Sequence, residues 1–219
     1  MTSRPKAVLA TGNAGKLREL EALLGDYWNL LPQADLGIDE IAETGHSLLE
    51  NALIKARHAS ASSGLPAIAD DSGLEVEALG GEPGVQSSRY AGERADAAAN
   101  NAKLLEALNK TPPDQRTARF RCVIVFVRRA DDPDPVVAEG VWEGTISQVR
   151  SGEGGFGYDP VFVDAVSGRT AAELEPEEKR ARSHRGQAVR CLLRQLEATG
   201  IPTQCGSGYA QPARFPGNS

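Results

Sequence analysis

The chain has 219 residues, of which 40% are hydrophobic and 25% are charged, and its 24 basic residues against 30 acidic ones give a net charge of −6. This composition is typical of a globular protein, and the length fits one large domain or two closely packed lobes. Bulk nucleic acid and anionic membranes are unfavourable partners, because both repel an acidic surface.

Cysteine usage and the N-terminal segment indicate the compartment. The three cysteines, Cys122, Cys191 and Cys205, form no C-x-x-C pair, which argues against a disulfide framework and a zinc site. We expect Cys122 and Cys191 to be small core residues. The segment before Thr11 lacks the apolar stretch of a signal peptide or membrane helix, so we expect a cytoplasmic protein with no nucleic-acid or membrane partner.

Strand and helix patterns alternate in the first part of the chain. A short apolar strand at 6–10 runs into a small-residue loop at 11–15. A helix with one apolar face is expected from about Lys16 to Gly25, and a second strand at 28–31.

A second helix is expected after Ser47. Ser47 and Glu50 have the spacing of a capping box, in which each side chain bonds the other residue's backbone amide. The helix that follows carries an apolar stripe and ends at Gly64. A brief buried strand at 67–69 comes next, and its end is followed by Asp70-Asp71-Ser72-Gly73 and a half-exposed strand.

The second half of the chain continues the alternation, which predicts an α/β architecture with mixed strand directions. Its expected elements are a helix at 96–108, strands at 120–127 and at 136–142 with an extension towards 148, an irregular glycine-rich segment at 152–160, a short strand at 161–163, and a helical region at 177–196 with a break near Gly186.

The loop Thr11-Gly12-Asn13-Ala14-Gly15-Lys16 is a candidate anion site. A loop between a strand and a helix N-terminus directs amides and the helix dipole at an anion, and Lys16 adds a positive charge. The spacing is not that of a Walker loop. An ordinary strand–helix turn is the alternative.

Asp70 and Asp71 are candidate metal ligands. Two carboxylates at the end of a buried strand are costly to hold together without a cation, and Mg²⁺ prefers a few carboxylates together with water and substrate phosphates. An aspartate-rich turn is the alternative interpretation.

Two further segments could contact a nucleotide. The loop Gly154–Pro160 holds Phe156 and Tyr158 among glycines, where aromatic rings can stack on a base or, alternatively, fold into the core. Lys179 and the segment 183–186 offer cationic and tunable donors, or simply a solvated basic helix face. His46 and His58 have no such neighbours and are expected at the surface.

These segments together resemble one known family. The motifs TGNAGKLREL, ETGHSLLENALIKARHA, AIADDSGLEVEALGGEPGVQSSRY, GGFGYDPVF and EEKRARSHRGQA are similar to those of the inosine triphosphate pyrophosphatase family, which includes the bacterial dITP/XTP pyrophosphatases. The resemblance extends from about Lys6 to Leu196.

The resemblance implies a fold and a function. The fold would be α/β, with two lobes on a long curved mixed sheet with flanking helices, an active-site cleft between the lobes and one domain over 1–199. The segment 200–219 is rich in Gly, Pro and Ser and has no periodicity, so we expect a flexible tail there. The enzyme would be a homodimer that uses Mg²⁺ to hydrolyse dITP, ITP and XTP to the monophosphate and pyrophosphate, and so removes deaminated purines from the nucleotide pool.

The resemblance also implies residue roles. Asp71 matches the proton acceptor and a magnesium ligand. Glu43 is the candidate for a second ligand, and the sequence departs from the family here, because the acidic pair that members often carry reads Ala42-Glu43. The residues that match substrate contacts are Thr11, Gly12, Asn13, Ala14, Gly15, Lys16, Ser72, Phe156, Gly157, Tyr158, Asp159, Lys179, His184 and Arg185.

Three other functions stay open at this point. A related pyrophosphatase could act on pyrimidine or other modified triphosphates, a regulatory module could bind the nucleotide without hydrolysis, and a kinase or ATPase could transfer or release orthophosphate. The missing Walker spacing argues against the last, and the Asp70-Asp71 pair argues against mere binding. Among purines, donors from His184 or Arg185 would select a 6-oxo group, because adenine would leave such a donor unpaired.

Overall fold

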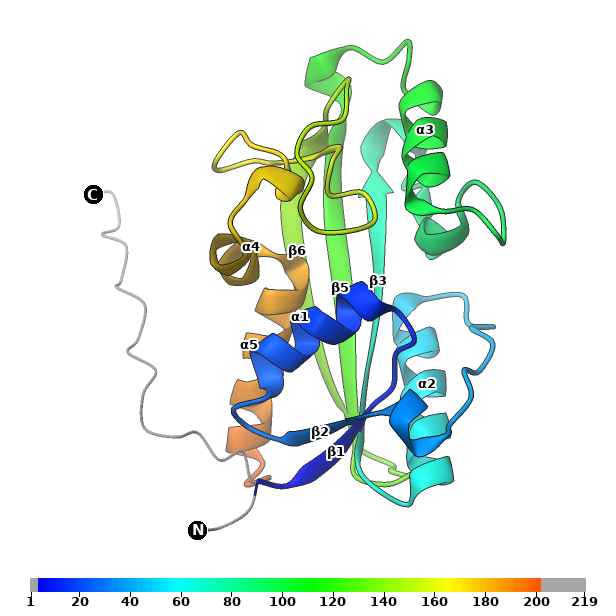
Figure 1. The fold of residues 1–219 in the computed structure, drawn as a ribbon, viewed down its shortest axis with the longest axis vertical. Coiled ribbons are helices and arrows are strands. Elements are labelled where there is room, and N and C mark those ends of the chain that lie inside the picture. Colours follow the sequence, from blue (N-terminus) through cyan, green and yellow to red (C-terminus); the bar gives the residue numbers. More distant parts are fainter. Residues whose placement is uncertain (1–3, 202–219) are drawn as a thin grey trace, which may run out of the picture.

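One mixed β-sheet runs through the protein. The computed structural model describes residues 4–201, and within them the strand order is β2-β1-β3-β5-β6-β7, with the short strand β4 paired to β3. Figure 1 shows three long strands running along the molecule: β3 (Ala67–Val76), β5 (Thr117–Val127) and β6 (Val136–Ile146). β1 pairs in parallel with β2 and β3, and the other pairs are antiparallel. The predicted mixed α/β sheet with flanking helices is confirmed.

The other elements are shorter. The remaining strands are β1 (Lys6–Leu9), β2 (Asn29–Pro32), β4 (Pro83–Gly84) and β7 (Phe162–Asp164). The helices are α1 (Ala14–Leu24), α2 (Leu48–Ser63), α3 (Ala97–Ala107), α4 (Pro176–Arg182) and α5 (His184–Ala198), and 3₁₀ turns span Gln33–Leu36, Glu77–Leu79, Ser87–Arg89, Pro113–Gln115 and Ala171–Glu173. No helix within residues 4–201 is both long and apolar enough to span a lipid bilayer.

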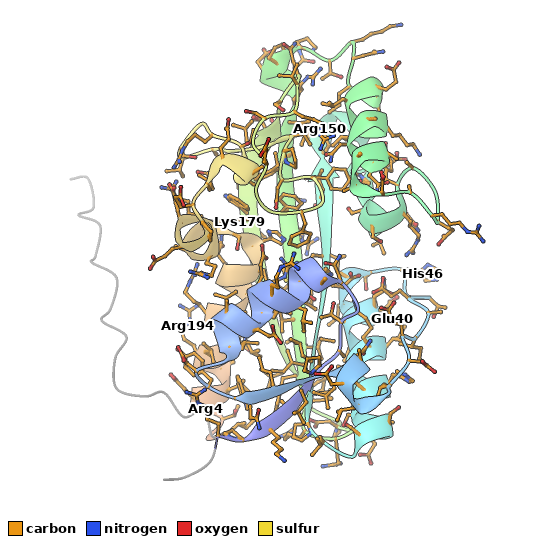
Figure 2. The ribbon with its side chains drawn as sticks, viewed as in Figure 1. Arg4, Glu40, His46, Arg150, Lys179 and Arg194 are labelled. Carbon is orange, nitrogen blue, oxygen red and sulfur yellow. The ribbon has the colours of Figure 1, made fainter. Side chains whose placement is uncertain are left out.

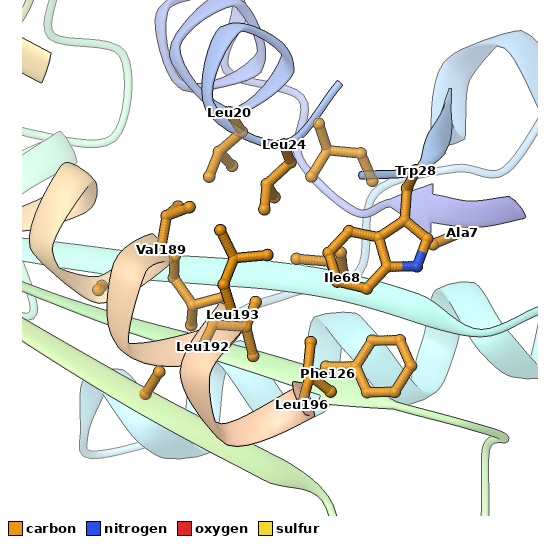
Figure 3. Close-up of a cluster of buried hydrophobic side chains, with 14 of the residues drawn as sticks. Ala7, Leu20, Leu24, Trp28, Ile68, Phe126, Val189, Leu192, Leu193 and Leu196 are labelled. Carbon is orange, nitrogen blue, oxygen red and sulfur yellow. The ribbon is translucent and has the colours of Figure 1, made fainter. Parts of the chain in front are cut away.

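Helices cover both faces of the sheet at the end that carries β1 and β2 (Figure 1). On one face, α1 and α5 pack leucines against β3 and β5, and Figure 3 shows this cluster with Leu20, Leu24, Ile68 and Leu192. On the other face, α2 packs an alanine stripe against the valines of β5. Small side chains let α2 lie close to the strands, and burial of these apolar surfaces is the main stabilising contribution. α3 lies near the far end of β3, over a third cluster.

The strand β3 is longer than the sequence suggests. The expected break at Asp70 does not occur, because β3 pairs with β5 without interruption from Ala67↔Val127 to Val76↔Ala118. The ladder satisfies the backbone groups of the polar segment, so no turn is needed. The aspartates therefore lie in the middle of a strand, and the prediction of a strand end there is wrong.

Helix ends also differ from the expected positions. α1 begins at Ala14 because the Asn13 side chain accepts hydrogen bonds from the amides of Gly15 and Lys16 at 2.9 and 3.1 Å. Only half of the capping box forms at α2: Ser47 accepts from the Glu50 amide, but the Glu50 carboxylate accepts from the amide of His46 at 2.6 Å.

The break between α4 and α5 lies at Ser183 and not near Gly186. Ser183 is extended, and its hydroxyl accepts from the Gly186 amide at 3.1 Å, which caps α5. Gly186 lies in the first turn of α5, where an added Cβ would collide with the carbonyl oxygen of Arg180. This glycine is needed for the close approach of two helices, so the expected break there is wrong.

Gly140 of β6 allows the N-terminus of α5 to lie directly on the sheet. A Cβ there would collide with the carbonyl oxygen of His184 and would lie 2.6 Å from the Ala188 amide nitrogen. We expect Gly140→Ala to lower the free energy of unfolding by about 1–3 kcal/mol, as overpacking does, measured by urea denaturation. Glu139→Ala, at the neighbouring and 52% exposed position, should change it by less than about 0.5 kcal/mol. Equal effects of the two variants would contradict this packing argument.

Candidate functional site

Two adjoining cavities lie along β3. The first, which we call the acidic cavity, has a volume of about 330 Å³ and is lined by Glu40, Glu43, Lys55 and Asp71 among others. The second, the aromatic cavity, has a volume of about 360 Å³ and is lined by Phe120, Phe156, Tyr158, His184 and Arg185 among others. Both are lined by Asn13, Lys16, Ser72 and Ser88, so one elongated ligand can extend across them.

Asp70 and Asp71 have different surroundings because side chains alternate along a strand. Asp70 is fully buried on the side of α1 and α5, and Asp71 is 6% exposed and lines the acidic cavity. The two carboxylates still share a cation, because the Lys16 ammonium lies 3.2 Å from an Asp70 oxygen and 3.7 Å from an Asp71 oxygen.

Asp70 is the centre of a buried charge network. Its Oδ2 accepts hydrogen bonds from Nε and Nη2 of Arg185 at 3.2 and 3.1 Å and from the Ser72 hydroxyl at 3.0 Å. The Lys55 ammonium donates to the Asp70 carbonyl oxygen at 2.6 Å. Burial opposes ionisation of Asp70, but Lys16, Arg185 and Lys55 outweigh it and hold the pKa of this carboxyl far below its usual range.

Asp71 is held differently. Its Oδ2 accepts from the Asn51 amide at 3.2 Å, and its Oδ1 lies 3.8 Å from the Lys55 ammonium. Burial raises the pKa of Asp71, and the carboxylates of Glu43 and Asp70 add to this, against the opposing effect of Lys16 and Lys55. A carboxylate with a raised pKa in a cavity is a candidate proton acceptor.

Lys55 bridges the carboxylates around the acidic cavity. Its ammonium lies 2.6 Å from Glu43 and 3.8 Å from Asp71. Burial opposes its charge, but Asp70, Asp71 and Glu43 together raise the pKa of Lys55.

Glu40 lies over the loop before α1, since a Cβ on Gly12 would collide with its carboxylate. In Figure 2, Glu40 comes from the segment before α2 and Lys179 from α4.

Phe156 forms one wall of the aromatic cavity. Its ring lies on Gly15 at the start of α1, where a Cβ would be 2.6 Å from the ring. The Lys179 ammonium lies 5.0 Å from the centre of the same ring, within range of a cation–π interaction. Phe156 is half-buried, whereas Tyr158 is folded into the core and donates to the Ser87 carbonyl at 2.9 Å. The interpretation as a core residue is therefore confirmed for Tyr158, and stacking on a base stays a prediction for Phe156.

Lys179 and Arg185 are tied to α1 by Glu19. The Glu19 carboxylate binds the Lys179 ammonium at 2.7 Å and Nη1 of Arg185 at 2.5 Å, and Lys179 also binds Asp159 at 2.6 Å. Lys179 is 8% exposed and Arg185 is 1% exposed, so the interpretation of this segment as a solvated basic face is wrong. Burial raises the pKa of Asp159 against the opposing effect of Lys179.

His184 lies flat against Phe120, with ring centres 4.7 Å apart and planes 14° from parallel. Burial, supported by the neighbouring charges of Arg185 and Lys179, lowers the pKa of His184 well below its usual value, so the ring is neutral. Its Nδ1 is buried and has no partner among the described residues. A neutral ring can present either a donor or an acceptor to a ligand.

The structure brings the residues singled out from the sequence to one place. The acidic cavity is lined by Thr11, Gly12, Asn13, Lys16, Asp71 and Ser72, and the aromatic one by the residues of 156–159, Lys179, His184 and Arg185. Ala14 and Gly15, also predicted as substrate contacts, line neither of these two cavities. Three participants were not identified from the sequence: Glu19, Asn51 and Lys55. Asn51 and Lys55 are four residues apart, next to the apolar stripe of α2, and polar residues at such positions could have indicated them.

His46 is exposed, and His58 is half-buried with its Nε2 2.9 Å from the Asp39 carbonyl oxygen. Cys205 and the segment 202–219 lie outside the described residues.

Comparisons with known proteins show to which family the chain belongs. Residues 7–195 match the Ham1 family. The chain belongs to this family. It is 60% identical to a dITP/XTP pyrophosphatase of Thioalkalivibrio sulfidiphilus over 88% of this chain and 98% of the relative, and 57% identical to one of Escherichia coli O157:H7 over 86% and 96%.

Solved structures of Ham1-family proteins share the fold. A HAM1 protein from Coxiella burnetii superposes with a TM-score of 0.82 at 48% identity, covering 89% of this chain and 99% of that one. A nucleoside-triphosphatase / dITP/XTP pyrophosphatase from Mycobacterium abscessus gives a TM-score of 0.68 at 45% identity, covering 86% and 98%. The prediction of the family from the sequence motifs is confirmed.

The Asp70 network should stabilise this Ham1-family protein in a pH-dependent manner. The pKa of the Asp70 carboxyl is lower in the folded chain than in the unfolded chain. The contribution of Asp70 to the free energy of unfolding is therefore fully present above about pH 4 and is lost as the pH falls further. We expect Asp70→Asn to lower the free energy of unfolding by about 3–5 kcal/mol at pH 7, because it leaves buried cations uncompensated, and to weaken the pH dependence on the acid side.

The matched control for this experiment is Asp131→Asn, at a carboxylate that is 84% exposed beside Arg129. Denaturant unfolding between pH 3 and 7 measures both variants. If Asp70→Asn were as stable as the control at pH 7, the buried network would not have the stabilising role described here.

Proposed function

We propose that this Ham1-family protein hydrolyses dITP, ITP and XTP to the nucleoside monophosphate and pyrophosphate. The observation that carries the proposal is the position of Asp71, a carboxylate with a raised pKa in the acidic cavity beside two ammonium groups, next to a cavity with an aromatic wall. Relatives at 57–60% identity that bear the name dITP/XTP pyrophosphatase support the substrate class. The enzyme would cleanse the nucleotide pool of deaminated purines.

The nucleotide would extend across both cavities. The base would lie against Phe156 in the aromatic cavity, and the triphosphate would enter the acidic cavity past Lys16, which lines both. The amides at the start of α1 and the dipole of this helix favour the phosphates there. Lys16 and Lys55 supply full positive charges.

The charges of the site favour a divalent cation. Four cations, Lys16, Lys55, Lys179 and Arg185, are ion-paired with five carboxylates, Glu19, Glu43, Asp70, Asp71 and Asp159. With all nine groups ionised, this cluster carries a net charge of −1, so it does not by itself neutralise a triphosphate. No three His, Cys, Asp or Glu side chains between residues 4 and 201 converge as a complete metal site. Mg²⁺ fits this arrangement, since it commonly takes one or two carboxylates and completes its shell with phosphate oxygens and water.

Asp71 would hold the metal, and Glu43, which also lines the acidic cavity and shares Lys55 with Asp71, is the candidate second ligand. When bound, the metal would supply charge neutralisation on the phosphate oxygens. Asp71 would take a proton from a water molecule whose oxygen forms a bond to the α-phosphorus. The bond between the α-phosphorus and the bridging oxygen would break, and pyrophosphate would leave. Lys16 and Lys55 would offset the charge on the phosphate oxygens, and Asn51 would keep the Asp71 carboxylate in place.

Recognition of the base would depend on few free donors. Arg185 makes four hydrogen bonds to Glu19, Asp70 and Ser72, so at most one of its five N–H groups is left for a base. His184 is neutral and lines the same cavity. A donor from either residue to a 6-oxo group would exclude adenine, because its amino group would leave that donor unpaired.

Other properties expected from the sequence or from the family resemblance stay predictions. These are the homodimer, the cytoplasmic location, the single domain over residues 1–199 and the flexible tail from residue 200. Two other functions remain testable in the same assay: a pyrophosphatase for pyrimidine or other modified triphosphates, and a module that binds the nucleotide without hydrolysis.

A substrate panel tests the proposed function. We expect pyrophosphate release from ITP, dITP and XTP in the presence of Mg²⁺, with kcat/KM at least about 10²-fold above that for ATP, dTTP and UTP, because adenine leaves a donor unpaired and a pyrimidine has one ring fewer to fill the cavity. Preference for dTTP or UTP would favour the pyrimidine alternative. Binding of ITP without release of pyrophosphate, with or without Mg²⁺, would favour the binding module.

Asp71→Asn tests the assigned proton acceptor. The amide keeps the shape of the side chain but cannot take the proton, so we expect kcat for ITP to fall by about 10³-fold while ITP still binds, measured by pyrophosphate release and calorimetry. Asp35→Asn, at an exposed carboxylate away from both cavities, is the control and should retain full activity. An Asp71→Asn enzyme with wild-type kcat would refute the assignment.

A further inference from the structure

Asn101 is a buried polar residue on the helix that borders the aromatic cavity. Its side chain is fully buried in α3. The side-chain Nδ2 donates to the carbonyl oxygens of Ala97, at 2.7 Å, and of Gly157, at 2.9 Å. The side-chain Oδ1 has no partner among residues 4–201. Burying an amide with one unpaired oxygen is unfavourable, so packing alone does not account for an asparagine here.

The bond to Gly157 is the one that leaves the helix. Ala97 lies one turn before Asn101 on α3, so the bond to its carbonyl adds no contact with the rest of the protein. Gly157, by contrast, lies 56 positions further along the chain and lines the aromatic cavity together with Phe156 and Tyr158. Asn101 therefore connects α3 to the loop that would contact the base.

This loop has little regular structure to hold it. Gly152, Gly155 and Gly157 all have φ between +62° and +79°, a region in which glycine is favoured but which costs conformational entropy to fix. Within the described chain, the Gly157 carbonyl bonds only Asn101, and the Gly157 amide has no hydrogen-bond partner. This amide is free to bond a ligand in the cavity that Gly157 lines.

The neighbouring residue on α3 holds a second segment that lines the aromatic cavity. The Asn100 side chain accepts from the Ala91 amide at 2.7 Å and donates to the Ser88 carbonyl at 3.0 Å. Ser88 and Gly157 both line the aromatic cavity. Two consecutive asparagines of α3 thus connect one helix to two segments that line the aromatic cavity.

We propose that Asn101 is a positioning residue for base recognition, which holds the Gly157 carbonyl and thereby sets the place of Gly157 and Phe156 against the purine. The inference rests on the proposed function and deepens it. Asn101 does not line either cavity, so it acts on the substrate through the loop. Its loss should weaken binding of the base and leave the hydrolysis step itself intact.

The test compares Asn101→Leu, which keeps the size of the side chain and removes the donor, with wild type. A second variant, Asn101→Ala, removes the donor without any risk of crowding. Loss of one hydrogen bond to a neutral carbonyl corresponds to about a 3- to 10-fold effect. We expect KM for ITP and the Kd for IMP to rise by about this factor, kcat to stay within about twofold, and the Kd for inorganic pyrophosphate, which has no base, to stay unchanged.

Leu108→Ala is the matched control. Leu108 is fully buried at the end of the same helix, two turns from Asn101, so this variant loosens the packing of α3 without removing the bond to Gly157. It should lower the melting temperature and leave KM and the Kd for IMP as in wild type.

The outcomes are distinct. Unchanged KM and IMP affinity in both Asn101 variants would overturn the proposal, as would equal weakening of IMP and pyrophosphate binding. Failure of both variants to fold would also overturn it, because Asn101 would then serve the folding of α3. Failure of the proposed function is separate: the wild type itself would release no pyrophosphate from ITP, dITP or XTP.

Discussion

The fully buried carboxylate of Asp70 organises the site. The carboxylate forms ion pairs with Lys16 at the start of α1 and with Arg185 at the start of α5. The backbone carbonyl of Asp70 accepts a hydrogen bond from Lys55 of α2. An isolated buried charge is unfavourable, so each of these contacts depends on the others. Three helices that are far apart in the sequence are thereby fixed in relation to β3, and the two cavities lie among them.

The alternation of side chains along β3 separates two tasks. Asp70 lies on one side of the strand and forms ion pairs inside the protein, whereas its neighbour Asp71 lines the acidic cavity. Lys16 lies within 4 Å of both. The structural network and the proposed proton acceptor are therefore coupled by one ammonium group. A phosphate that binds Lys16 would compete with both carboxylates.

Close contacts at glycines bring these elements together. Gly140 lets α5 approach β6, Gly186 lets α4 meet α5, and Gly15 lets Phe156 lie on α1. Each is a position where a side chain would displace an element that carries a site residue. At the aromatic cavity, asparagines of α3 hold loops that have little regular structure of their own.

The sequence by itself determined the order of strands and helices, the family and the four segments that form the site, because apolar periodicity and short polar motifs are local features. It also indicated that Asp71, Lys16 and Phe156 would act together, through the resemblance. Only the tertiary structure decided that β3 continues through Asp70, because its pairing with β5 compensates for a polar stretch that is a poor strand former. Likewise, Glu19, Lys55 and Asn101 have roles that arise from contacts with residues 15 to 166 positions away, and no local pattern encodes such distances.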